Sequence, residues 1–168
     1  MSIFDFRRGG EPARILLEQY KEAIKDVWVD KSRLKHLHLT PLEEKLLDET
    51  KISYMIGKNT HLVPVIYPID ALRGLKLIAN PSVRKKANVL NNNPYLFPST
   101  RQSEFHLSGW HGFEDICNRV DLIEPENITF TKNRHLVSSI YSVLELPENE
   151  RNSFYDHMGH SESMNKHR

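Results

Sequence analysis

Arginines stand at two places where a bound anion would be stabilised. Arg7 and Arg8 precede Gly9 and Gly10 at the start of a predicted helix, so their guanidinium groups lie beside backbone amides that have no partner within the helix. Arg134 opens a second predicted helix, on the face turned away from the core, where it can meet a partner. Each guanidinium offers a fixed fork of N–H groups that suits a phosphate. Each of the two places therefore predicts an anion-binding position.

Lys58 and His160 add an ammonium and an imidazole at two predicted turns. Lys58 falls on the loop of a predicted hairpin, beside Gly57. Gly159, which has no side chain, lets the chain turn and present His160. The simpler interpretation stays open for every such group, because a lysine at a loop tip or a charge pair near an N-terminus is usually just solvated.

The elements that must position these residues are helices and one hairpin. Apolar runs from Ile52 to Ile56 and from Leu62 to Ile66 flank a short turn and predict two paired strands. Proline and glycine positions and apolar spacing predict helices that begin near Pro12 and Pro41, and others near 68–79, 109–120 and 148–158. A further helix is predicted to open at Arg134 and to stop before Pro147. The stretch 91–99 predicts a polar turn followed by a short apolar strand.

Apolar spacing also predicts which face of each helix is buried. The first helix should bury Ile15, Leu16 and Tyr20. The helix near 109–120 should bury Trp110, Phe113, Ile116, Cys117 and Val120. The helix that carries Arg134 should bury Leu136, Ile140, Val143 and Leu144.

Composition sets the broad class. The 168 residues fit one domain, with 39% apolar and 27% charged residues, and no apolar run approaches a membrane span. The single cysteine, Cys117, excludes an intramolecular disulfide. The net charge of +1 means that any contact with DNA must come from local basic clusters. The candidates are Arg73, Lys76, Arg84, Lys85 and Lys86.

Nine histidines leave a zinc-binding or protein-interaction domain open as a competing interpretation. His36 and His38 would share one face of a strand, and Cys117 could join His106 and His111 at a metal ion. Neither set offers a convincing complement of ligands, so we favour a solvated face for the first and a core position for Cys117. The sequence therefore predicts no metal site.

Four short patterns occur in an order that resembles a known family. They are Arg-x-x-Glu from Arg8 to Glu11, Gly-Lys at Lys58 followed by Leu-Val-Pro, Arg134 at a helix start, and Gly-His-Ser around His160. In this order they resemble the catalytic domain of the tyrosine recombinases, the phage-integrase family, in the version carried by animal mobile elements. The resemblance implies an α+β fold, mainly helical with a small antiparallel sheet at the hairpin near 52–66. Residues 1–168 would be a single partial domain, truncated at both ends.

The resemblance also implies a reaction. Arg8, Lys58, Arg134 and His160 would be the catalytic residues, and a tyrosine expected just beyond Arg168 would attack a DNA phosphodiester. This transesterification forms a covalent 3′ phosphotyrosine and needs no cofactor or metal. The implied partners are double-stranded DNA and, in the full-length protein, further copies of itself, with no membrane. The implied processes are site-specific DNA recombination and DNA integration in the nucleus. The fragment alone is expected to be inactive.

The sequence departs from the family pattern beside the second arginine. The family usually has histidine or lysine three residues before it, where this chain has Thr131. Glu11, Thr131, Lys132 and His135 are therefore auxiliary candidates. The alternative interpretation is a domesticated, non-catalytic DNA-binding module derived from a mobile element.

Overall fold

The computed structural model describes residues 10–34, 38–57, 62–144 and 146–158, and these form two compact units. The described part of the first unit comes from residues 13–55 and 64–107. That of the second comes from residues 10–12, 56–57, 62–63 and 108–158. The combination of helices with one small antiparallel sheet confirms the predicted α+β fold class. The single recombinase-type domain stays a prediction.

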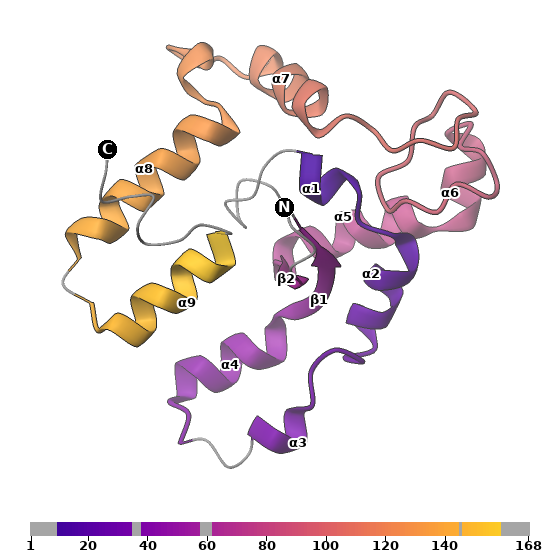
Figure 1. The fold of residues 1–168 in the computed structure, drawn as a ribbon. Helices are drawn as coiled ribbons and strands as arrows, with labels where there is room; N and C mark the ends of the chain where they lie inside the picture. The colour runs from indigo at the N-terminus through magenta and orange to yellow at the C-terminus, as the bar shows by residue number, and fades with distance from the viewer. Residues whose placement is uncertain (1–9, 35–37, 58–61, 145, 159–168) are drawn as a thin grey trace. The chain divides into compact units, whose positions relative to one another are not determined.

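The first unit consists of short helices and one hairpin, joined by irregular segments (Figure 1). Its elements are α2 (Leu17–Ile24), α3 (Lys31–Leu34), α4 (Pro41–Glu49), β1 (Lys51–Ile56), β2 (Leu62–Tyr67), α5 (Ile69–Ala79) and α6 (Pro81–Lys86), the strands reaching into the second unit at their loop ends. The other helices are α1 (Gly10–Ala13), α7 (Gly109–Arg119), the short 3-10 turn η2 (Pro125–Asn127), α8 (Phe130–Val143) and α9 (Glu148–Met158).

The predicted hairpin is confirmed, since β1 and β2 pair in an antiparallel two-stranded sheet. Alternate residues face the core, as a strand's period of two requires. Ser53 and Tyr67 are both fully buried and share a hydrogen bond of 2.8 Å between their hydroxyls. The ring of Tyr20 meets that of Tyr67 edge to face, at 5.7 Å between centroids. Burial raises the pKa of Tyr20, so this phenol stays neutral in the core.

The predicted helix start at Pro41 is confirmed by a complete capping box. The Thr40 hydroxyl accepts from the Glu43 amide, and the Glu43 carboxylate accepts from the Thr40 amide at 2.7 Å. Those hydrogen bonds, first from the Thr40 backbone and then from its hydroxyl, lower the pKa of Glu43. At pH values above the ordinary pKa of an unfolded glutamate, the cap therefore stabilises α4 fully. This stabilisation is lost as the pH falls through the lower pKa that Glu43 has in the folded protein.

The single helix predicted to begin near Pro12 is wrong, because the chain breaks into α1 and α2. Between them the backbone pairs with a distant segment. The Leu17 amide donates to the Pro94 carbonyl and the Leu96 amide to the Ile15 carbonyl, both at 2.8 Å. Ile15 is buried in this pairing, while Leu16, which was predicted to be buried, is exposed. A β-bridge to residues far along the chain overrides the local helical pattern.

The strand predicted within 91–99 is also wrong. The segment begins with the predicted turn, but the residues after it form only isolated bridges, at Leu16 with Tyr95 and at Pro98 with His106. Side chains add to the few backbone hydrogen bonds at these bridges. Arg84 donates from its two terminal nitrogens to the carbonyls of Asn93 and Tyr95, at 2.7 and 3.0 Å. Burial lowers the pKa of Arg84, and its role here is structural.

The predicted inner face of α7 is only partly right. Cys117 is a buried core residue, as predicted, and Phe113 packs against Phe130 with ring centroids 4.5 Å apart. Trp110, Ile116 and Val120, however, are more than half exposed. The helix is anchored along a narrow strip at Phe113 and Cys117, so the wider apolar face that the sequence suggests is left open.

Candidate functional site

Three of the four predicted catalytic residues, Arg8, Lys58 and His160, lie outside the described residues. The described chain leads directly to two of them. Strand β1 ends at Ile56, and Gly57 follows immediately before Lys58. Helix α9 ends at Met158, two residues before His160. The fourth, Arg134, lies within the described residues on α8.

Arg134 lies on the inner face of α8, with only 8% of its surface exposed. The helix begins after Thr129, whose hydroxyl accepts a hydrogen bond of 3.1 Å from the Lys132 amide. Phe130, Arg134 and Ser138 recur every four residues and are all buried. A buried guanidinium is costly unless it is matched by opposite charge or hydrogen bonds. Its position is therefore fixed by the fold.

The prediction that Arg134 points out of the core is wrong. The predicted stripe of Leu136, Ile140 and Val143 is instead more than half exposed. Aromatic packing decides the rotation of α8. The Phe113 ring packs on Phe130 at one end, and at the other Tyr141 stacks on Phe154 of α9 at 3.7 Å between centroids. Because aromatic rings bury more area than aliphatic side chains, their face turns inward and carries Arg134 with it.

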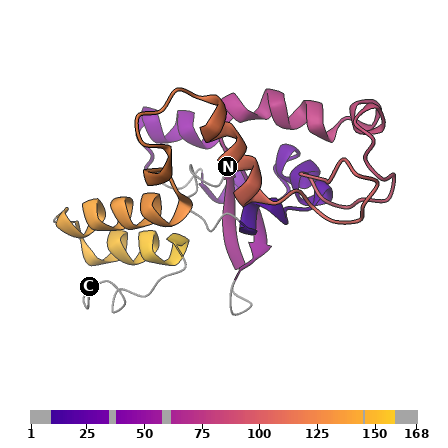
Figure 2. The same ribbon diagram turned by 90° about the horizontal axis from the view of Figure 1, so that it is seen from above.

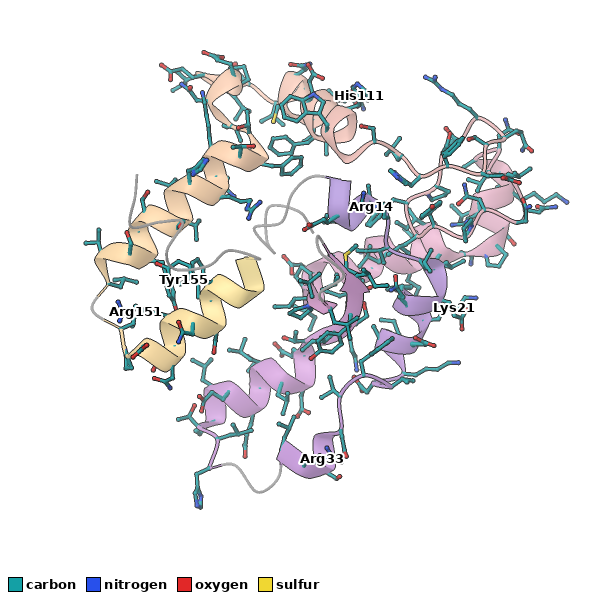
Figure 3. All side chains as sticks on the ribbon, viewed as in Figure 1. Arg14, Lys21, Arg33, His111, Arg151 and Tyr155 are labelled. Carbon is teal, nitrogen blue, oxygen red and sulfur yellow. The ribbon has the colours of Figure 1, made fainter. Side chains whose placement is uncertain are left out.

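Helices α8 and α9 lie side by side (Figures 1 and 2). Tyr155 points from α9 toward α8 (Figure 3), where its ring meets Tyr141 edge to face at 6.4 Å. The Tyr141 hydroxyl also reaches the backbone carbonyl of Glu150 at 3.4 Å. Aromatic contacts along α9 thus hold this pair of helices together.

The exposed stripe on α8 gives a direct test of this rotation. Leu136→Ala and Ile140→Ala should each change the free energy of unfolding by less than about 0.5 kcal/mol, because surface substitutions rarely cost more. The same truncation at a buried site removes about 2–5 kcal/mol. Urea denaturation of both variants measures the difference. A loss at the buried level would mean that the stripe, and not the Arg134 face, is the covered side of α8.

The auxiliary candidates fall into two groups. Glu11 is buried, with 8% of its surface exposed, and it belongs to the same compact unit as Arg134. Thr131 and His135 lie on exposed turns of α8. Lys132 is held by its ammonium group, which donates to the Asn127 side chain at 2.6 Å and to a backbone carbonyl of η2 at 3.3 Å. Of the four, only Glu11 shares the burial of Arg134.

All six tyrosines of the chain lie within the described residues, and none is fully exposed. Tyr20, Tyr67 and Tyr155 are buried, the last with 4% of its surface exposed. A nucleophile must reach a phosphorus atom, so a phenol enclosed by other rings is poorly placed to attack. Tyr155 in particular is occupied in the packing of α8 against α9.

Basic side chains of the first unit gather on α5 and α6. Arg73, Lys76, Lys85 and Lys86 are exposed, whereas Arg84 is half-buried and holds two carbonyls. The four exposed cations can meet phosphates without disturbing the fold. Arg84 is better explained by its structural contacts.

The histidine and cysteine positions form no metal-binding group in the described part of the chain, where no three histidine, cysteine or acidic side chains gather suitably. His106 instead packs its ring on Tyr95 at 5.1 Å, and its Nδ1 lies 2.9 Å from a backbone carbonyl. His111 is exposed on α7 (Figure 3). His36 lies outside the described residues.

Comparison with known proteins found no matching family model, no matching curated protein and no matching solved structure. Within the described residues no helix is long and apolar enough to cross a membrane.

Proposed function

We propose that residues 1–168 form part of a tyrosine recombinase catalytic domain, a DNA breaking-rejoining protein of the site-specific recombinase and integrase type. The observation that carries the proposal is the order of Arg8, Lys58, Arg134 and His160 in suitable local sequence contexts along nearly the whole chain. A hairpin whose first strand ends at Ile56, two residues before Lys58, supports it. So does an arginine near the start of a capped helix.

The chemistry follows from the charges. Transesterification at a DNA phosphodiester places extra negative charge on the non-bridging oxygens of a crowded transition state. Arg8 and Arg134 would clamp those oxygens with guanidinium forks, and His160 would donate a further hydrogen bond. Lys58 would protonate the departing 5′ oxygen as general acid. Rejoining would reverse these steps, with the bond energy kept in the 3′ phosphotyrosine.

The burial of Arg134 is compatible with this role. A transition-state clamp works best when its donors are held in place and screened from water, since they then need no reorganisation as charge develops. Arg134 is fixed by α8 and the aromatic packing at both ends of that helix. The exposed cations of α5 and α6 would hold the DNA backbone, and the protein would act in the nucleus, with self-association on DNA.

The alternative function is a non-catalytic DNA-binding module derived from a mobile element. The four exposed cations of α5 and α6 support it, because they can hold a DNA backbone without any nucleophile. Such a module would keep the arginines and basic elements while making no covalent bond to DNA. Both functions require phosphate binding at Arg134 and differ in covalent chemistry.

DNA binding is tested by fluorescence anisotropy of a labelled duplex at fixed salt. Arg134→Ala should weaken binding by about tenfold or more, because charge-assisted contacts to phosphate contribute about 1.5–3 kcal/mol each. Arg119→Ala is the matched control, since its side chain is 75% exposed, lies in the same unit, and pairs along α7 with Asp115. Arg151 is a poorer control, because it is half-buried with an inaccessible Nε.

Arg134→Lys keeps the charge while losing the fork, and separates a folding defect from a binding defect. Its thermal unfolding should stay close to that of the parent chain while its affinity falls. Equal affinities for the Arg134→Ala and Arg119→Ala variants, both folded, would remove Arg134 from the site.

A further inference from the structure

The second unit contains a pocket that the proposed function does not use. It lies between α7 and the segment from η2 to the start of α8, with a volume of about 360 Å³. Its apolar wall includes Trp110, Phe113, Cys117 and Ile128. A volume of this size suits a small ligand or a single long side chain, at the lower end of the range for binding pockets.

The aromatic wall is both rigid and accessible. Phe113 is fixed by its contact with Phe130, at 4.5 Å between ring centroids. Trp110 has 51% of its surface exposed, although its position on α7 predicted a core residue. An indole face that is open to solvent beside a fixed phenyl ring is suited to cover a ligand, and it is the strongest aromatic partner for a cation.

The polar part of the pocket is acidic. Two carboxylates, from Glu114 on α7 and Glu126 in η2, line it together with uncharged polar groups. Among the described residues that line it, none is lysine, arginine or histidine. The cations near the pocket have partners within the protein. Arg119 pairs with Asp115 at 2.6 Å, and the Lys132 ammonium is held by the Asn127 side chain at 2.6 Å and by the backbone carbonyl of Glu126 at 3.3 Å, which leaves the Glu126 carboxylate to a ligand.

We propose that this pocket binds an organic cation, an ammonium or guanidinium group on an apolar stem. The stem would lie against Ile128 and Phe113, and the cationic head would face the indole of Trp110 and the carboxylates of Glu114 and Glu126. Lysine and arginine side chains of a partner polypeptide have this chemistry, and so do small alkylammonium compounds. An anionic ligand such as DNA would be repelled, so this site is distinct from a phosphate-binding surface.

The test follows the fluorescence of Trp110 in a Trp28→Phe background, since the chain has only two tryptophans. Butylammonium and N-acetyl-lysine-N-methylamide are the cationic probes. 1-Butanol and N-acetyl-norleucine-N-methylamide are their neutral counterparts. Both cations should give a saturable change, with an affinity about five- to tenfold above that of the matched neutral probe, because the charged head adds the ionic and cation–π terms.

Substitutions then assign the contacts. Glu114→Gln together with Glu126→Gln should weaken the cationic probes by about five- to tenfold and leave the neutral probes unchanged. Asp121→Asn is the control, since it removes one exposed acid of the same unit that does not line the pocket. Trp110→Ala, followed through the backbone amide shift of Asn118, should cost about fivefold to thirtyfold.

The two cationic probes distinguish the source of the ligand. Tighter binding of the capped lysine would assign the pocket to a polypeptide side chain, and tighter binding of butylammonium to a small amine. Equal binding of cationic and neutral probes would overturn the proposal. So would the absence of saturable binding by either cation to a protein whose circular dichroism shows it folded.

Discussion

A tyrosine placed directly after Arg168 should convert the chain into a protein that forms a covalent complex with DNA. On a nicked suicide substrate the 5′ leaving strand diffuses away, so the 3′ phosphotyrosine accumulates and migrates as a shifted band after denaturing electrophoresis. The chain that ends at Arg168 should give no such band. Its tyrosines are buried or half-buried. Tyr155, the tyrosine closest to His160 in the sequence, has 4% of its surface exposed.

The same gel tests the clamp. Arg134→Ala in the extended chain should reduce the rate of band formation by about 10²–10³, the cost of removing one preorganised donor from a developing oxyanion. Arg119→Ala should leave the rate within about twofold, since exposed charges contribute little. Retained DNA binding without any band would favour the non-catalytic module. A band of equal intensity in the Arg134→Ala variant would exclude this arginine from the chemistry.

Elements set by local chemistry could be predicted from the sequence. The start of α4 follows from Thr40, Pro41 and Glu43, three neighbours that satisfy each other's hydrogen bonds. The hairpin follows from two apolar runs and a short turn, which need only each other. In both cases the residues that decide the structure lie within about fifteen positions of one another, so the pattern contains the answer.

Helix faces and interruptions could not be predicted in the same way. Leu136 and Ile140 have the spacing of a buried stripe, yet the rings of Phe113 and Phe154, on two other helices, turn the opposite face inward. The break before α2 depends on hydrogen bonds to a segment some eighty residues away. Periodicity gives the angle between side chains on one helix, but the partner decides which side is covered.

The candidate site shows both situations. The placement of Arg134 near the start of a helix follows from local signals, since Thr129 caps α8. The burial of Arg134 does not follow from local signals, because it depends on aromatic residues of α7 and α9, which are far from Arg134 in the sequence pattern. The open pocket beside Trp110 was hidden for the same reason, as a tryptophan at helical spacing is normally a core residue.

Asn93→Ala should be the most destabilising single substitution in the stretch of three asparagines, with a loss of about 2–4 kcal/mol of unfolding free energy. Its side chain is 97% buried, given an exposed fraction of 3%, and bonds three backbone groups. The amide donates to the carbonyls of Ser103 and Phe105 at 2.8 and 2.9 Å, and its oxygen accepts from the Tyr95 amide at 3.0 Å.

The two bonds from the Asn93 amide join two segments where no ladder does, because only isolated bridges occur there, and the third bond holds the turn at Tyr95. Alanine would leave the Ser103 carbonyl and the Tyr95 amide without this partner, whereas the Phe105 carbonyl keeps the Ser99 amide, and a buried polar group left unmatched costs about 1–3 kcal/mol. Asn92→Ala is the matched control, since it is exposed one position earlier and should change stability by less than about 0.5 kcal/mol. Urea denaturation of the two variants separates them. Equal midpoints would mean that water replaces the Asn93 amide at no cost and that the contacts of Arg84, the Tyr95 ring and the backbone bridges are sufficient to hold the segment 93–106.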